Sequence, residues 1–402
     1  MMMKAYFLEK SKEYQRKLKD VLPGGMHYNY RFKESRVPLY FTRGDKSRLW
    51  DLDGNEYLDF YAKSGALIFG HHHREYNNAL IRAIDGLLSV DSTDADLLAC
   101  QYLQKYIPCC EMARFGLSGS EMVQNAFRLA RAYTGKNRII RFEGHFHGTG
   151  ENVLGGTTEN RDHPIPRDDG AGVFSTGGRA KDMLESQTFL LPWNNFELLE
   201  KTVAQYEPEI AAIIMEPIAL NAGSIMPRPG FLKQVRELCD QKNLVLIFDE
   251  VVTGIRLGLG GAQSFFGVVP DLCILGKCIG GGGVPLSVIA GKYDIMKQYE
   301  DNTVIHGGTF NGYPLGLAAL QATFEIIHKN SDELYGNMED CMGKIHDAFR
   351  KAAQNTGLDL VIQGPRPCAS FHLSSTIIEN HHDLNDQIIT RNGVVRDRLA
   401  AY

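Results

Sequence analysis

Apolar and polar positions along the middle of the chain predict strands and helices that follow one another. Residues 243–250 are apolar until two acids at their end, a pattern typical of a buried parallel strand. Residues 122–133 follow a helical period, and the apolar run 138–142 after them predicts another strand. Alternation of this kind, from about residue 70 to about residue 310, predicts a doubly wound, mostly parallel α/β sheet.

The two ends of the chain have a different pattern, which predicts a second, smaller unit. Residues 9–22 favour a charged amphipathic helix, and residues 39–60 favour strands that turn at Asp53-Gly54. We expect this leading arm to pack with the C-terminal part as an α+β domain. The predicted division is an arm at 1–65, a large domain at 66–312 and a small domain at 313–402.

The most informative candidate for chemistry is Lys277, which ends one apolar run and is followed at once by glycines. Desolvation there would lower the pKa of the ammonium group and free the amine for a Schiff base. A lysine that reaches solvent at the end of a strand is the alternative. Asp249 ends the apolar run before it, so both side chains are expected at one edge of the sheet, where such folds bind ligands. The pair suits pyridoxal phosphate, which needs a lysine for its aldehyde and a carboxylate for its pyridine nitrogen; Asp249 as a helix cap is the alternative.

A candidate phosphate site precedes the helix at 122–133. Ser118-Gly119-Ser120 would offer N–H groups, hydroxyls and the positive end of the helix dipole to an anion. An ordinary cap by either serine, with Glu121 as the acid of the first turn, accounts for the same residues.

The segment after the strand at 138–142 holds an aromatic residue between two histidines. Phe146 could stack on a heteroaromatic ring. His145 and His147 could instead form a metal pair, although a closed site needs three or four ligands and no further partner is evident at a compatible spacing.

Together these motifs resemble those of the class III, or ω-type, pyridoxal-phosphate aminotransferases, and within them the branch of glutamate-1-semialdehyde 2,1-aminomutase. The resemblance runs from about residue 10 to about residue 375, which is far more specific than any single motif. The motifs occur in the expected order: Pro23-Gly-Gly25 with Arg31, Trp50-Asp-Leu-Asp-Gly54 to Asp59-Phe60, Ser118-Gly-Ser-Glu121, Arg128-Leu-Ala-Arg-Ala-Tyr-Thr-Gly135, Phe142-Glu-Gly-His-Phe-His-Gly148, Glu216-Pro217, Phe248-Asp-Glu-Val-Val-Thr-Gly-Ile-Arg256, Leu275-Gly-Lys277 and Gly307-Gly-Thr-Phe-Asn-Gly312.

The resemblance implies a fold-type I transferase that moves an amino group between a carboxylate-bearing amino acid and a keto acid or aldehyde. Its cofactor would be pyridoxal 5′-phosphate, bound to Lys277 as a Schiff base. The residues implied around the cofactor are Asp249 at the pyridine nitrogen, Gly119 and Ser120 at the phosphate, Phe146 on the ring and Asn221 beside the 3-hydroxyl. The resemblance also implies a homodimer, in which Thr309 reaches the phosphate of the neighbouring subunit.

The substrate side departs from the aminomutase pattern. Arg31 matches an arginine that binds the substrate carboxylate, but Lys63-Ser64 and the stretch from Tyr28 to Tyr30 replace other residues of that side of the pocket. These departures favour an aminotransferase over the aminomutase. An intramolecular aminomutase or an amino-acid racemase is the alternative, because the same residues would serve all three reactions. The family also carries a further strand and helix beyond the position of Tyr402, so we expect an incomplete small domain.

The charge and composition of the chain favour small molecules as its binding partners. The net charge of −5 gives no electrostatic case for nucleic acid, and no apolar stretch reaches the length of a membrane span. Eight cysteines without metal spacing fit a reducing, cytoplasmic setting. The glycines at 280–283 lack the context of a nicotinamide fingerprint, and a catalytically inactive scaffold would not explain the retained site residues. The polar segment 148–187 is expected to form a lid over the cofactor.

Overall fold

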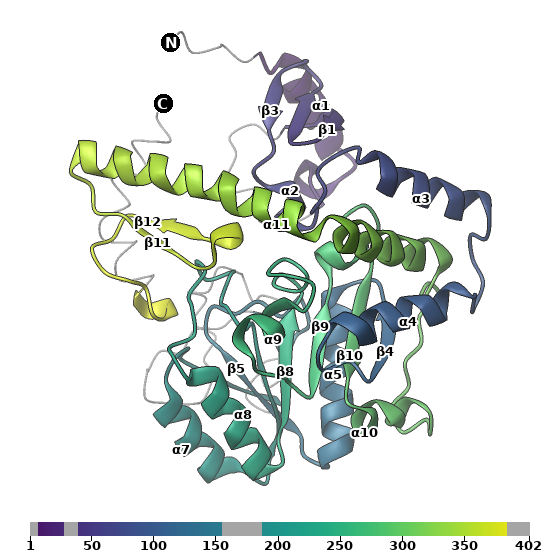
Figure 1. Cartoon of the computed structure of the whole chain (residues 1–402), viewed down its shortest axis with the longest axis vertical. Helices are drawn as coiled ribbons and strands as arrows, with labels where there is room; N and C mark the ends of the chain where they lie inside the picture. Colours follow the sequence, from purple (N-terminus) through teal and green to yellow (C-terminus); the bar gives the residue numbers. More distant parts are fainter. Residues whose placement is uncertain (1–6, 28–38, 155–186, 384–402) are drawn as a thin grey trace.

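The computed structural model describes residues 7–27, 39–154 and 187–383 of the chain (Figure 1). Its centre is a seven-stranded sheet with the strand order β4-β10-β9-β8-β7-β5-β6. The strands are β4 (Met112–Gly116), β5 (Arg138–Phe142), β6 (Thr188–Leu191), β7 (Ile210–Met215), β8 (Val245–Glu250), β9 (Leu272–Leu275) and β10 (Ser287–Gly291). Only β10 runs antiparallel to its neighbours, β4 and β9. The predicted doubly wound, mostly parallel sheet is therefore confirmed.

Alternate residues of the strands enter two separate apolar cores, one on each face of the sheet. Ile247 and Ile274 belong to the core under α5 (Gly119–Thr134), whereas Phe248 and Cys273 belong to the other. The second core is covered by α4 (Ala95–Tyr106), α7 (Phe196–Tyr206), α8 (Phe231–Lys242) and α9 (Gly261–Phe266). Burial on both faces explains why these strands are continuously apolar in the sequence. Short helices α10 (Tyr293–Met296) and η4 (Lys297–Tyr299) follow β10.

The N-terminal arm is built on a three-stranded antiparallel sheet with β1 (Phe41–Asp45), β2 (Arg48–Asp51) and β3 (Glu56–Leu58). Its turn at Asp53-Gly54 is as predicted. Asp53 also accepts the amide of Lys10 at 2.8 Å and the hydroxyl of Ser11 at 2.7 Å, which fixes α1 (Glu9–Lys19) to the sheet. The 3₁₀ turn η1 (Pro23–Gly25) and the turn α2 (Ala62–Gly65) complete this part, and α3 (Arg74–Asp85) follows it.

One helix of 43 residues, α11 (Pro314–Thr356), joins the core to the C-terminal region. Its first half packs on α3, α4 and the turn η3 (Lys277–Gly280), and its second half packs on η5 (Arg366–Cys368). Its backbone leaves helical geometry at Asn330, where φ is −125°. Beyond it, β11 (Val361–Gln363) pairs with β12 (Ser370–His372). None of the helices within the described ranges is long and apolar enough to cross a membrane.

Candidate active site

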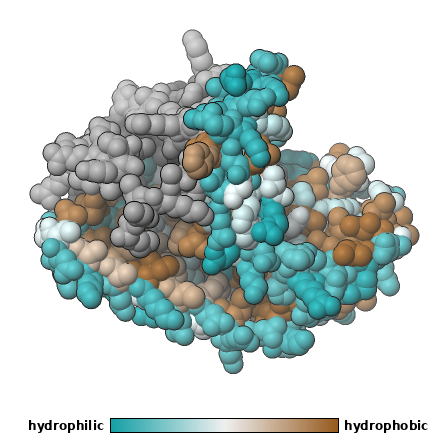
Figure 2. Space-filling view, turned by 90° about the horizontal axis from the view of Figure 1, so that it is seen from above, coloured by the Kyte–Doolittle hydropathy of each residue, from teal (hydrophilic) through white to brown (hydrophobic). Residues whose placement is uncertain are grey.

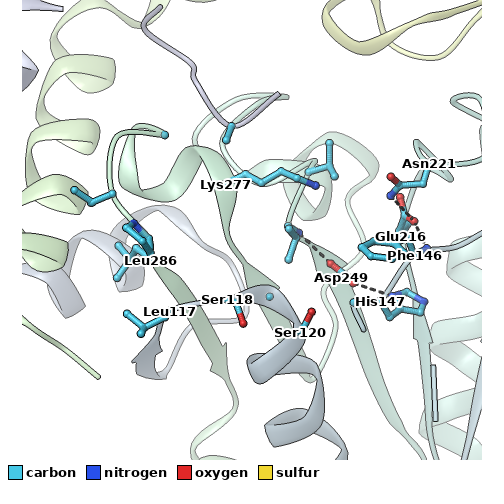
Figure 3. A pocket seen from close by; sticks show the side chains of 18 of the residues that line it. Leu117, Ser118, Ser120, Phe146, His147, Glu216, Asn221, Asp249, Lys277 and Leu286 are labelled. Carbon is cyan, nitrogen blue, oxygen red and sulfur yellow. Dashed lines mark hydrogen bonds and ion pairs between the residues drawn. The ribbon is translucent and has the colours of Figure 1, made fainter. Parts of the chain in front are cut away.

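A pocket of about 410 Å³ lies at the carboxyl edge of the central sheet (Figure 3). Parallel strands deliver their ends to this edge, which is where α/β sheets of this kind bind ligands. Most of the predicted cofactor residues are among those that line it. The lining residues are Ala66, Leu117, Ser118, Gly119, Ser120, Phe146, His147, Gly148, Glu216, Asn221, Asp249, Val251, Val252, Lys277, Gly282, Gly283, Val284, Pro285 and Leu286.

Lys277 is the basic group of the pocket. It is separated from β9 by Gly276, and its backbone adopts the left-handed conformation with φ of 47°. Its side chain lines the pocket (Figure 3). Burial lowers the pKa of its amine below the usual 10.5, although the nearby carboxylates of Glu216 and Asp249 act in the opposite direction. Its side chain is half-buried in the pocket, so the amine is partly desolvated, as the Schiff-base interpretation expects.

Asp249 is the acid that faces this lysine from the neighbouring strand. β8 and β9 are parallel, and Asp249 is in register with Ile274, three residues before Lys277. One carboxylate oxygen, Oδ2, lies 2.8 Å from His147 Nδ1, and the other accepts the amide of Val251 at 3.1 Å. Asp249 is only 4% exposed. The bond to Val251 lies at the start of the loop after β8 and does not cap a helix. Asp249 is therefore a buried carboxylate that two hydrogen bonds fix in place.

The N-terminus of α5 closes the opposite end of the pocket. Ser118 is the cap residue, whose hydroxyl accepts the amide of Glu121 at 3.3 Å, so the capping interpretation is confirmed for this residue. The first amides of a helix have no intrahelical acceptors, so capping does not exclude an anion beside Gly119 and Ser120. The Ser120 hydroxyl accepts the amide of Thr149 at 3.1 Å, which joins the helix to the loop after β5.

Gly148 shows how closely that loop approaches the helix. Its φ is +94°, and a Cβ there would lie 2.3 Å from Ser120 Oγ and 2.7 Å from Ser120 Cα. Only glycine fits both the conformation and the space. The loop with Phe146 and His147 and the helix start with Ser120 therefore form one continuous wall.

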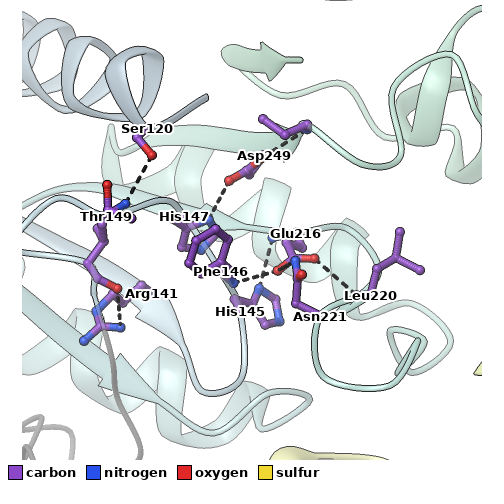
Figure 4. Close-up of polar contacts among 12 residues, drawn as sticks. Ser120, Arg141, His145, Phe146, His147, Thr149, Glu216, Leu220, Asn221 and Asp249 are labelled. Atoms are coloured by element: carbon purple, nitrogen blue, oxygen red, sulfur yellow. Dashed lines mark hydrogen bonds and ion pairs between the residues drawn. The ribbon is translucent and has the colours of Figure 1, made fainter. Parts of the chain in front are cut away.

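Glu216 organises the rest of this wall, and the sequence reasoning gave it no role (Figure 4). Its Oε1 accepts the amide of Phe146 at 2.7 Å and the Asn221 side chain at 3.0 Å, and its Oε2 accepts the amide of Leu220 at 3.2 Å. Burial, and next the charge of Asp249, raise the pKa of Glu216 above its usual 4.5. A signal was available, because Glu216 follows the apolar strand β7 just as Asp249 ends β8.

The two histidines beside Phe146 are bound to carboxylate and backbone partners. His145 Nδ1 accepts the amide of Glu216 at 3.0 Å, and burial lowers the pKa of His145 well below 6.5. The His147 ring bonds to Asp249 instead. In the part of the chain that the structure describes, no three His, Cys, Asp or Glu side chains are grouped so that they could hold a metal ion.

Several residues predicted for the substrate or for a second subunit lie elsewhere. Lys63 is exposed on the turn α2, and Thr309 is exposed in the segment between η4 and α11; neither lines the pocket of the single chain. Tyr28 and Arg31 lie outside the described residues, as does most of the segment expected to form a lid. Their roles stay predictions.

The fold and this site define a class of protein, and comparisons with known proteins agree. The model of the family Aminotransferase class-III matches residues 30–361. The chain therefore belongs to the class III aminotransferases, and it has the fold-type I architecture of pyridoxal-phosphate enzymes.

Particular relatives narrow the similarity. A glutamate-1-semialdehyde 2,1-aminomutase of Methanospirillum hungatei is 37% identical over 390 residues, which are 95% of this chain and 88% of the relative. An ω-transaminase of Sphaerobacter thermophilus has a TM-score of 0.84 at 28% identity and covers 93% of this chain and 85% of its own. A transaminase solved with PLP bound has a TM-score of 0.80 at 26% identity and covers 90% and 82%.

The cofactor of this family is pyridoxal 5′-phosphate, and the residues of the pocket fit it. A half-buried lysine with a lowered pKa suits the aldehyde, and a buried carboxylate suits the pyridine nitrogen. Gly119, Ser120 and Gly148 line the pocket at the start of α5, where the first amides of the helix suit a phosphate. The chain is therefore a PLP-dependent enzyme of class III.

Proposed function

We propose that the protein is an aminotransferase that binds its cofactor through Lys277 and transfers an amino group from a carboxylate-bearing amino acid to a keto acid or aldehyde. The observation that carries the proposal is the pair Lys277 and Asp249, a half-buried amine and a buried carboxylate that face one pocket from adjacent strand ends. When bound, PLP withdraws electrons from the α-carbon of the amino substrate and so makes its C–H bond acidic.

Each residue of the pocket has a role that its contacts support. Lys277 Nζ, which burial keeps less basic, is suited to hold the cofactor's aldehyde and to move a proton at the substrate α-carbon. Asp249 is suited to keep the pyridine nitrogen protonated, since His147 fixes the carboxylate in place. The start of α5, with Gly119 and Ser120, is suited to the phosphate.

The faces and edge of the cofactor ring are assigned in the same way. Phe146 is fixed at its backbone by Glu216 and offers an aromatic face, whereas Val251 offers an apolar contact from the loop after β8. Asn221 is oriented by the same carboxylate, which supports its assignment beside the 3-hydroxyl. Glu216 thus aligns two cofactor contacts at once.

An intramolecular aminomutase is the second candidate, because the curated relative described above carries that activity in its name. The same residues would serve both reactions; the outcome depends on whether the deaminated intermediate stays bound. We keep Arg31 as the residue for the substrate carboxylate, with Tyr28 and Lys63 on the substrate side. An amino-acid racemase, with the same chemistry, is the remaining alternative.

A spectroscopic experiment tests the proposal. The purified protein should absorb visible light and lose that absorbance when an amino donor is added. Borohydride reduction should fix the cofactor to the peptide that contains Lys277, and Lys277→Ala should bind cofactor without fixation or turnover. Lys201→Ala, an exposed lysine on α7, is the matched control and should behave as the wild type. A wild-type protein that ignores added PLP would refute the proposal.

The reaction type follows from product analysis. Strict dependence on an added keto acid or aldehyde would indicate an aminotransferase. An isomer formed from glutamate 1-semialdehyde without an acceptor would indicate the aminomutase, and inversion of an amino acid without an acceptor would indicate a racemase.

We also infer a homodimer that shares its sites. Apolar side chains are exposed on α3, on α4, on the segment between them and on the segment that carries Thr309: Ile81, Ile84, Leu87, Leu88, Leu97, Leu98, Ile305 and Phe310. Figure 2 shows apolar side chains gathered toward its right-hand side, where Figure 1 draws α3 and α4. An apolar surface of this kind is typical of an interaction site.

A complementation experiment tests the shared site. If Thr309 completes the neighbour's phosphate site, mixed dimers of Lys277→Ala and Thr309→Asp contain one site with both native residues, and activity returns on mixing. If Thr309 acts within its own subunit, both sites of the mixed dimer are defective and no activity returns. The division into parts at 1–65, 66–312 and 313–402 and the cytoplasmic location stay predictions.

A further inference from the structure

Arg256 lies where three distant parts of the chain meet beside the pocket. Its Nη2 donates to the carbonyl oxygen of Gly65 in the arm and to Cys278 Sγ, at 2.7 Å, in the turn that begins with Lys277. Its Nε donates to the carbonyl oxygen of Val252 at 3.2 Å in the loop after β8. The Cys278 thiol donates to the same Gly65 carbonyl at 3.2 Å. One guanidinium thus joins the arm to the turn of the candidate cofactor lysine.

The segment held in this way has an unusual backbone. Ala62, Lys63, Ser64 and Gly65 have φ of 43°, 54°, 58° and 74°, so four consecutive residues are left-handed and three of them carry a Cβ. Such a turn is costly for L-residues and persists only where its surroundings fix it. At its start, Asp59 accepts the amides of Tyr61 and Ala62 at 3.1 and 2.8 Å. At its end, Arg256 and Cys278 hold the carbonyl of Gly65.

The position of this turn determines one wall of the pocket. Ala66, the next residue, lines the pocket beside Lys277. Its backbone packs so closely on the turn after η3 that a Cβ on Gly282 would lie 2.4 Å from the Ala66 carbonyl oxygen. The wall is therefore made by backbone contact, and it has no long side chain that could adjust if the arm moved.

The backbone that carries Arg256 is itself fixed from the C-terminal side. Ile255 is fully buried and left-handed, with φ of 51°, and its carbonyl accepts the hydroxyl of Tyr335 from α11 at 2.5 Å. The backbone before Arg256 and the guanidinium of Arg256 are therefore both held in place, and neither is free to follow a displaced arm. Arg256 acts as a fixed point against which the arm is held.

We propose that Arg256 is a positioning residue that holds the left-handed turn Ala62–Gly65 against the Lys277 turn and thereby forms the substrate-side wall of the pocket. The inference rests on the proposed function, because the wall matters only if Lys277 binds the cofactor. Loss of Arg256 releases the arm and weakens substrate binding, whereas the phosphate end and Asp249 keep the cofactor in place.

The variant Arg256→Met tests this role, with Arg256→Lys as the conservative change. Arg350→Met, an exposed arginine that pairs with Asp347 on α11, is the control. In the protein without cofactor, hydrogen–deuterium exchange should become faster in peptides covering residues 58–70 for Arg256→Met alone. In the loaded enzyme, KM for the amino donor should rise by about ten-fold with kcat changed much less, because a hydrogen bond from a charged group is lost. Arg256→Lys should restore part of both effects.

A second readout uses the electrostatics of Lys277 without turnover. The groups that face this amine are the carboxylates of Glu216 and Asp249, the Arg256 guanidinium and the Cys278 thiol; the guanidinium lowers the pKa of Lys277. PLP uptake by the cofactor-free protein requires the neutral amine. The pH midpoint of the uptake rate should therefore move upward in Arg256→Met and stay unchanged in Arg350→Met.

The outcomes separate the inference from the proposed function. Unchanged exchange at residues 58–70 together with an unchanged KM in Arg256→Met would overturn the role of Arg256, even if the wild type binds PLP at Lys277. Failure of the wild type to fix PLP at Lys277 would instead overturn the proposed function. Cys278→Ser, which keeps a donor to Gly65, should show smaller effects than Cys278→Ala; equal effects of these two variants would contradict the shared clamp at the Gly65 carbonyl.

Discussion

Replacing Gly148 by alanine tests whether the phosphate end of the pocket depends on the close approach of two backbones. The new Cβ would lie 2.7 Å from Ser120 Cα, where ordinary contacts begin near 3.4 Å, so the loop and the start of α5 must separate by roughly 0.7 Å. The left-handed φ of +94° adds its own penalty. The separation would also strain the bond from the Thr149 amide to Ser120.

The two contributions can be separated with a second glycine on the same helix. Gly135, the C-cap of α5, is also left-handed with φ of +70°, but a Cβ there would meet nothing within 4 Å. Gly135→Ala should therefore lower the unfolding free energy only through its left-handed backbone, by about 1 to 2 kcal/mol. Gly148→Ala should lower the unfolding free energy by that amount and by about 1 to 3 kcal/mol more, because the new methyl group overpacks the contact.

The assay measures the unfolding free energy of the cofactor-free protein in urea and the dissociation constant of PLP by absorbance. Gly148→Ala should be less stable than Gly135→Ala and should bind PLP about ten-fold or more weakly, since about 1.4 kcal/mol is a factor of ten. Gly135→Ala should bind PLP as the wild type does. Equal losses of stability in the two variants, with unchanged PLP binding in both, would refute the reasoning.

Three further predictions concern buried charges near the pocket. Glu216→Gln removes a carboxylate that raises the pKa of Lys277, so the pH midpoint of PLP uptake should move downward, and an upward shift would contradict this assignment. His147→Phe leaves Asp249 Oδ2 without its partner at 2.8 Å and should lower kcat by about ten-fold or more; steady-state assays that show wild-type kcat would exclude a positioning role. Burial raises the pKa of Glu250 above 4.5. The stabilising contribution of Glu250 is therefore present below pH 4.5 and is lost as the pH rises through its folded-state pKa. Unfolding free energies between about pH 5 and 8 should fall more steeply for the wild type than for Glu250→Gln, and parallel curves would refute the shift.

The sheet and the positions of Asp249 and Lys277 at its edge could be predicted from the sequence, because burial on both faces leaves a strong pattern. Strands at 138–142 and 243–250 correspond to β5 and β8, and the acid and lysine at strand ends meet as expected. The direction of β10 could not be predicted, since an apolar run has the same pattern whether it runs parallel or antiparallel.

Features that depend on contacts between distant segments were also missed. The left-handed turn Ala62–Gly65 contains a single glycine, so local preferences predict a different backbone, and tertiary contacts from Arg256 and Asp59 determine it. The contact of Glu216 with Phe146 could not be predicted for a related reason, because the two residues are 70 positions apart and lie in different loops.

The kink in α11 has a mechanical consequence. The helix is embedded in the core up to Ile327, whereas of the residues after Asn330 only His346 is buried. At about 1.5 Å per residue, the segment from Asn330 to Thr356 extends roughly 40 Å, so a bend of about 5° at the kink would displace the helix end by about 3.5 Å. The distal end of α11 is thus a natural place for a fluorescent label, because it converts a small angular change at Asn330 into a displacement large enough to measure.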